Sequence, residues 1–134
     1  MLNSFVLDFV LRMKITNNVN MFYLYQLPVP RLSAGAPCFD AIVPRAARLT
    51  CTSPAFAGLW RDVMGAPWDA SQAATDPAER RHLRAEIDAL VAHLYGLTRD
   101  EFAHILAAFP LVFPDDAAGK QKKAALLATY DQTA

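Results

Sequence analysis

The stretch DPAERRHLRAEIDALVAHLYG, residues 76–96, decides the fold class because it predicts one long helix with clear ends. Asp76 is placed as the N-cap, Pro77 takes the first helical position, and Glu79 completes a capping box. Five apolar side chains then recur on one helical face: Leu83, Ile87, Leu90, Val91 and Leu94. The closing glycine suits a left-handed C-terminal cap. We therefore expect an amphipathic helix over 76–95.

Downstream of this stretch the sequence predicts two further helices. Thr98 and Glu101 form a second capping box that starts a helix over 98–109, and Pro110 ends it. A last helix is expected over about 119–131.

Upstream, the sequence predicts two more helices. One covers 39–51, with its regular part starting at Pro44, because proline is tolerated in a first turn. Ser53-Pro54 opens the next helix, and Gly65 stops it.

The first thirty residues differ from the rest. Residues 4–15 predict a helix that is apolar nearly all round and therefore buried on most sides. Residues 16–20 are turn-forming, and the aromatic run 21–27 predicts a β-strand. A single strand leaves its backbone groups unpaired, so it requires a sheet that this chain does not otherwise supply.

The expected fold is thus mainly α: a helical bundle of about five to six helices with one short N-terminal β-strand. Three segments are predicted: a helix–turn–strand unit over 1–30, a linker over 31–37 rich in Pro, Gly and Ser, and a helical domain over 38–134. With 134 residues, 54% of them hydrophobic, the chain can form a real core.

Charge is unevenly distributed, although the 13 basic and 13 acidic side chains balance overall. The first fifty residues carry five cations against two carboxylates, Asp8 and Asp40, which leaves a balance of +3. We therefore expect a mild attraction to a polyanion, and only in this first third of the chain.

Several classes of protein are excluded by what the sequence lacks. The start of the chain is not a signal peptide, and no run approaches the roughly 20 apolar residues of a membrane span. Cys38 and Cys51 stand alone, which fits reduced thiols. We expect a cytoplasmic protein with no membrane partner.

No catalytic or metal-binding constellation is apparent. The sequence contains no [NDS]-P-P-[YF] loop, no glycine-rich phosphate loop and no HExxH. His82, His93 and His104 are spaced eleven residues apart, too far for one ion, so we interpret them as surface histidines. Arg80, Arg81 and Arg84 are interpreted as a solvated, salt-bridged face. We expect no catalytic, cofactor-binding or metal-binding residue in this chain.

Two stretches resemble a known family. LNSFVLDFVLRMKITNNVNMFYLYQLPVP, residues 2–30, resembles the end of the target-recognition domain in large adenine-specific DNA methyltransferases of the type IIG restriction–modification class and in related phage-defence methylases. RAARLTCTSPAFAGLWRDV and, later, ERRHLRAEIDALVAHLYGLTRDEFAHILAAFPLV are similar to the helical tail of the same enzymes.

The resemblance implies a non-catalytic C-terminal part of such an enzyme. The domain that binds S-adenosylmethionine would lie upstream, so this chain alone is expected to be inactive, whether or not the parent also cleaves DNA. The strand over 21–27 would be left over from a truncated sheet. Without that sheet, we expect the N-terminal helix and strand to pair between chains or to pack on the helical tail.

Double-stranded DNA is the partner that the resemblance implies, bound weakly or in the context of the parent. The candidate contacts are polar groups at the helix–turn–strand junction: Arg12, Lys14, Asn17, Asn18 and Asn20. For each residue taken singly, a purely structural role is the alternative. Arg12 and Lys14 would be the charged end of a helix, and the asparagines would be turn formers. The alternative is a stand-alone helical module that forms a homodimer through its N-terminal segment or docks on a separate catalytic methyltransferase subunit.

Overall fold

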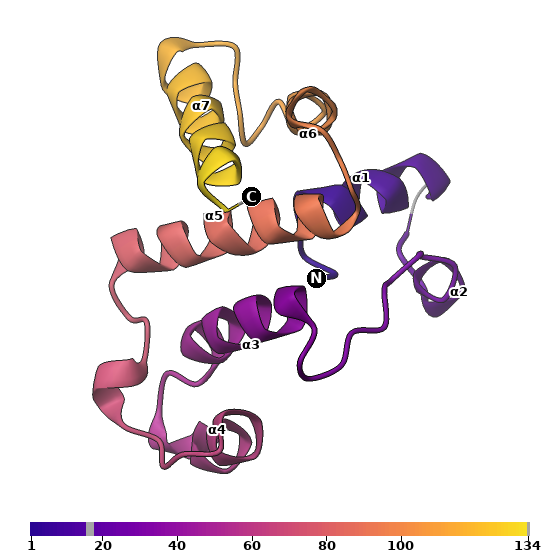
Figure 1. Cartoon of the computed structure of the whole chain (residues 1–134). Helices are drawn as coiled ribbons and strands as arrows, with labels where there is room; N and C mark the ends of the chain where they lie inside the picture. Colours follow the sequence, from indigo (N-terminus) through magenta and orange to yellow (C-terminus); the bar gives the residue numbers. More distant parts are fainter. Residues whose placement is uncertain (16–17, 134) are drawn as a thin grey trace. The chain divides into compact units, whose positions relative to one another are not determined.

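The computed structural model describes residues 1–15 and 18–133, and these form α-helices and short 3₁₀ turns with no β-strand (Figure 1). In chain order the elements are α1 (Phe5–Lys14), α2 (Met21–Leu24), α3 (Pro37–Thr50), η1 (Pro54–Phe56), α4 (Ala57–Met64), η2 (Ala70–Gln72), α5 (Pro77–Leu94), α6 (Arg99–Ala107) and α7 (Ala117–Gln132). The mainly α fold class is confirmed.

The strand predicted over 21–27 is wrong, because this segment forms the single helical turn α2. The Asn20 side chain accepts a hydrogen bond from the Tyr23 amide at 3.3 Å, and the Tyr25 amide donates to the Met21 carbonyl at 2.9 Å. A helical turn satisfies backbone groups locally, whereas a strand needs a neighbour. The described chain supplies no partner strand, so the aromatic run forms a helical turn.

Two further local predictions need correction. Helix α3 begins at Pro37, inside the predicted linker, so Pro44 lies within the helix and not in its first turn. In α5, Asp76 Oδ2 accepts the Glu79 amide at 2.8 Å, as expected of an N-cap. The Glu79 carboxylate, however, binds Arg48 of α3 instead of completing the capping box. A tertiary ion pair thus replaces a local one.

Packing divides the chain into two compact units, Met1–Arg31 with Asp88–Ala134, and Leu32–Ile87. Helix α5 contributes its first part to the second unit and the remainder to the first. The boundaries expected from the sequence, at 30 and 37, stay a prediction.

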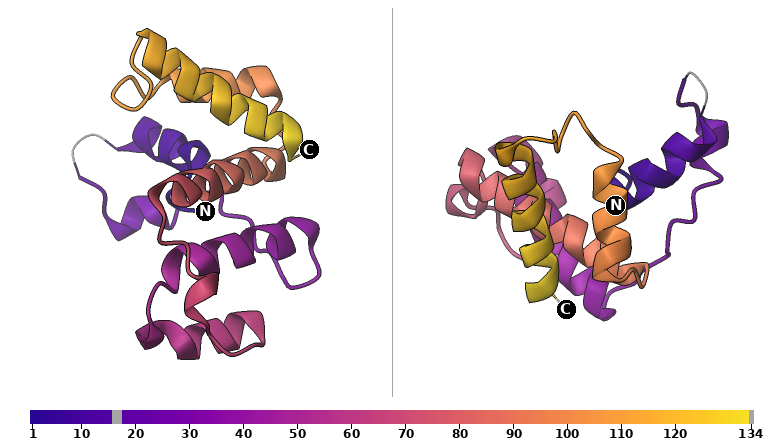
Figure 2. Two further views of the ribbon diagram at one scale, coloured as in Figure 1. Left: turned by 90° about the vertical axis from the view of Figure 1, so that its left-hand side faces the viewer. Right: turned by 90° about the horizontal axis from the view of Figure 1, so that it is seen from above.

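In the first unit α6 packs against both α1 and α7 (Figure 2). The Phe5 ring meets the Phe109 ring edge-on, with centroids 5.0 Å apart, and lies 5.3 Å from the Phe113 ring. Phe102 and Leu106 are fully buried between the helices. The N-terminal helix therefore packs on the helical tail, which is one of the two arrangements expected for it.

Helix α7 is held by aromatic and polar contacts at its end. The Tyr130 hydroxyl donates to the Leu97 carbonyl at 2.6 Å, next to the turn where Gly96 adopts the expected left-handed conformation, with φ +66°. The His93 ring stacks on the Tyr130 ring at a centroid distance of 3.9 Å. His93 is thus a half-buried packing residue, and its interpretation as a surface histidine is wrong.

Helix α1 receives its N-terminal cap from two sources. The Ser4 hydroxyl lies 3.5 Å from the Leu7 amide, and Asp88 Oδ1 of α5 accepts the Phe5 amide at 3.1 Å. Burial raises the pKa of Asp88 to about 7, against the opposing effects of the Phe5 hydrogen bond and the N-terminal ammonium of Met1. A partly buried carboxyl that is hard to ionise therefore joins α1 to α5.

The second unit is built on a small aromatic cluster and on arginine contacts. Buried Trp60 packs with Ala47 and Cys51, and the half-buried Trp68 indole donates to the Cys51 carbonyl at 2.8 Å. Arg45 of α3 pairs with Glu86 of α5 at 3.0 Å. These contacts connect α3 to the first part of α5.

No helix among the described residues combines the length and the apolar character needed to cross a membrane.

Replacing Asp88 with Asn is expected to flatten the pH dependence of stability. The folded pKa of Asp88 lies above its unfolded value near 3.8, so its contribution to folding is largest at low pH and is lost as the pH rises towards 7. Between those values each pH unit changes the free energy of unfolding by up to about 1.4 kcal/mol. An asparagine oxygen still accepts the Phe5 amide and carries no charge.

The measurement is urea unfolding of wild type and Asp88→Asn from pH 5 to pH 8. The three histidines are common to both proteins, so the difference between the two curves isolates Asp88. We expect the variant to be more stable at pH 8, and parallel curves would contradict this assignment.

Gly119 is expected to resist substitution, whereas Gly58 is not. A Cβ at Gly119, in the first turn of α7, would stand 1.9 Å from the Pro114 carbonyl oxygen, so the backbone would have to shift. At Gly58 in α4 the same Cβ meets open space. Chemical denaturation should show Gly119→Ala destabilised by about 1–3 kcal/mol or more and Gly58→Ala stabilised by about 0.5–1 kcal/mol. Equal effects would refute the packing at α7.

Candidate nucleic-acid interface

Four of the five predicted contact residues fall on the described part of the junction between α1 and α2, and Asn17 lies outside it. Arg12 and Lys14 are in the last turn of α1, while Asn18 and Asn20 follow in the connection to α2. All four are exposed, and α1 packs against α2. The structure thus brings these residues into one region of the surface.

The charge of Arg12 is already used within the unit. Its Nε and one terminal nitrogen donate to the two oxygens of Asp8 at 3.0 and 3.2 Å, and its guanidinium lies 5.0 Å from the centre of the Phe109 ring. A two-point contact with a carboxylate largely cancels the positive charge that a phosphate would meet. Arg12 therefore serves first to hold α1 against the end of α6.

Asn20 also has a structural role, since its side-chain oxygen caps α2. Its amide nitrogen is not consumed by that bond and retains its donors. Lys14 and Asn18 are exposed, and for neither does a hydrogen bond or ion pair appear within the described residues. Lys14 is thus the best-placed cation of the junction.

The remaining cations of the first fifty residues are mostly paired. Arg45 and Arg48 bind Glu86 and Glu79 in the second unit, while Arg31 is exposed at the end of the first. The attraction to a polyanion that the +3 balance predicts is therefore much weaker, because three of the five cations pair with carboxylates.

Sequence reasoning missed a group of exposed apolar side chains in the same region. Five of the eleven large hydrophobic side chains found exposed lie between residues 13 and 25: Met13, Val19, Met21, Phe22 and Tyr25. We call this group the junction surface. The strand interpretation assigned Met21, Phe22 and Tyr25 to a sheet. Met13 lies in the segment 4–15 that was expected to be buried on most sides, and its 75% exposure shows that this expectation was wrong for the end of α1.

Other candidate sites are weaker. Nowhere in residues 1–15 and 18–133 do three His, Cys, Asp or Glu side chains gather as a metal site would require. His82 and His104 are exposed, as expected. Of the predicted basic face on α5, Arg81 and Arg84 are exposed, but Arg80 donates to the carbonyls of Leu49 and Ala74 and is a packing residue.

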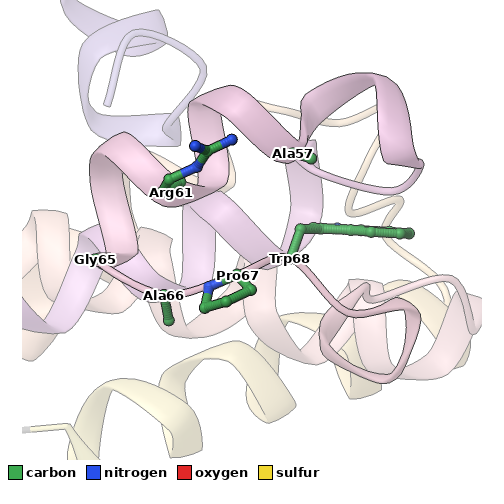
Figure 3. Close-up of a pocket in the computed structure, with 6 residues that line it drawn as sticks. All are labelled: Ala57, Arg61, Gly65, Ala66, Pro67 and Trp68. Carbon is green, nitrogen blue, oxygen red and sulfur yellow. The ribbon is translucent and has the colours of Figure 1, made fainter.

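A hollow of ≈ 440 Å³ lies beside α4 in the second unit, lined by Ala57, Arg61, Gly65, Ala66, Pro67 and Trp68 (Figure 3). Arg61 is its sole charged lining residue, and it points away from Pro67. A catalytic site requires several convergent polar groups. This hollow has one, so it does not assemble such a site.

Comparisons with known protein families, curated proteins and solved structures gave no match.

If the junction binds phosphate, freeing Arg12 should strengthen binding. Asp8→Asn removes the carboxylate that neutralises Arg12, and we expect it to raise the affinity for duplex DNA at low salt. Lys14→Ala should lower the affinity and reduce the slope of log K against log salt by about one unit. Fluorescence anisotropy with random-sequence duplex measures both.

Arg84→Ala, on α5, is the control because it removes one exposed cation from the other unit. The interface would be rejected if this control matched Lys14→Ala, or if Asp8→Asn bound no better than wild type.

Proposed function

We propose that this chain is the non-catalytic C-terminal part of an adenine-specific DNA methyltransferase or restriction–modification enzyme, acting in DNA target recognition and scaffolding. The family resemblance of residues 2–30 and of the helical tail motivates the proposal. The main structural support for the proposal is the junction surface, in which Met13 is 75% exposed and Tyr25 is 80% exposed. Large apolar groups clustered on a surface mark a place where another molecule packs.

The scaffolding part of the proposal has the stronger physical support. Helices α1, α6 and α7 form a packed unit through Phe5, Phe102 and Phe109. In the parent enzyme the remainder of the recognition domain would cover Met13 and Val19 of the junction surface. Lys14, Asn18 and Asn20 would lie at the edge of that contact, where polar groups reach DNA phosphates.

S-adenosylmethionine is the methyl donor that the parent would use, bound outside the residues described here. The proposed contribution of this chain is structural, because its helices would hold the recognition elements in position.

A stand-alone helical interaction module is the second candidate, and the pairing of the basic side chains favours it. Arg12, Arg45 and Arg48 all face carboxylates, which weakens any attraction to DNA. Such a module would use the junction surface to form a homodimer or to dock on a separate catalytic subunit.

DNA binding and oligomeric state, measured together, separate the two candidates. We expect the purified chain to bind random duplex weakly, with an affinity that falls as salt rises, and to be monomeric by light scattering. It should incorporate no tritiated methyl group from S-adenosylmethionine into mixed-sequence duplex. A stable dimer without DNA binding at low salt would establish the module instead, and methyl transfer above a no-protein control would refute both.

A further inference from the structure

Helix α2 presents two different faces. Leu27, just after it, is buried, and Tyr23 and Leu24 are half-buried on its inner side. Met21, Phe22 and Tyr25 are 56%, 67% and 80% exposed. Residues three and four apart share one side of a helical turn, so these three form a single outer face.

This outer face is held in place by its own backbone and neighbours. The Phe22 ring meets the half-buried Tyr23 ring edge-on, with centroids 5.6 Å apart and an interplanar angle of 75°. The Gln26 side chain donates to the Phe22 carbonyl at 3.3 Å, and the Tyr25 amide closes the turn onto Met21. Two aromatic rings are therefore offered to solvent from an ordered turn.

The charged side chains within residues 9–39 all have one sign, and the nearest preceding carboxylate, Asp8 of α1, is paired with Arg12. Residues 9–39 contain no aspartate or glutamate, while Lys14 and Arg31 are exposed within that span. Three exposed amide side chains, Asn18, Asn20 and Gln26, lie in the same span. An occupant that is anionic, presents flat apolar faces and accepts or donates hydrogen bonds matches all three features.

We propose that Phe22 and Tyr25 form a stacking platform for unpaired bases of nucleic acid, with Lys14 and Arg31 meeting the phosphates. Base–aromatic stacking is tolerant of sequence, and amides recognise base edges. This inference rests on the proposed function and deepens it, because it assigns single-stranded or extruded nucleotides to the junction surface.

The same observations disfavour two other occupants. A second copy of this chain, related by a two-fold axis, would bring the cations of one junction against those of the other. A lipid surface is bound by a long amphipathic helix with a strongly basic face. Helix α2 is a single turn of four residues, which is too short to lie along a membrane as such a helix does.

The test is fluorescence anisotropy of the full chain with a labelled thymidine oligonucleotide and with a duplex of equal length, at one salt concentration. Wild type should bind the single strand more tightly. Phe22→Ala and Tyr25→Ala should each weaken that binding by about fivefold or more and leave duplex binding unchanged. Phe56→Ala is the matched control, because Phe56 is an exposed aromatic at η1 in the other unit. Circular dichroism checks that all variants keep their helices.

The outcomes separate the platform from the proposed function. The platform alone is overturned if duplex binding needs Lys14 while Phe22 and Tyr25 have no effect and the single strand is not preferred. Binding of the single strand through these rings, without duplex binding, supports the platform and rejects the duplex role. Loss of a dimer in the two variants, or equal loss of binding to phosphatidylglycerol vesicles, overturns the platform in favour of a second copy or a lipid surface.

Discussion

Both compact units depend on side chains of α5, so the packing of this helix is the constraint from which the rest follows. Its first part supplies Glu79 and Glu86, which bind Arg48 and Arg45 of α3. Its second part supplies apolar residues to the other core, together with Asp88, which caps α1. One helix with two sets of partners must be long and regular, and the N-cap at Asp76 and the left-handed Gly96 define its two ends.

Backbone hydrogen bonding explains the structure of the N-terminal segment. An unpaired amide at a helix start is costly, and Asp88 relieves that cost for α1 from outside the helix. In α2 the aromatic run coils around the Asn20 cap, because a turn satisfies itself without a partner strand. The result is an ordered turn whose apolar side chains have no cover within the described chain. The same constraint that orders the segment therefore leaves the junction surface exposed.

The pairing of the cations decides how strongly this chain can attract a polyanion. Counting charges gives the first fifty residues a balance of +3, but an ion pair cannot serve a partner as a bare cation does. Arg12 holds α1 to Phe109, and Arg48 holds α3 to α5. What the junction offers is one exposed lysine, several amides and exposed aromatic rings. That combination favours contact through surface shape and stacking over long-range electrostatic attraction.

The sequence by itself determined the helices with local signals. The cap at Asp76, the capping box of Thr98 and Glu101, and the left-handed Gly96 all act within a few residues, so they are readable without a fold. Only the tertiary structure decided which long-range contacts formed, including the pairing of Glu79 with Arg48 and the stacking of His93 on Tyr130. Those depend on partners more than thirty residues away, whose approach is set by packing and not by spacing. The aromatic run at 21–27 has strand-like composition, and only the lack of a sheet in the described chain made it helical.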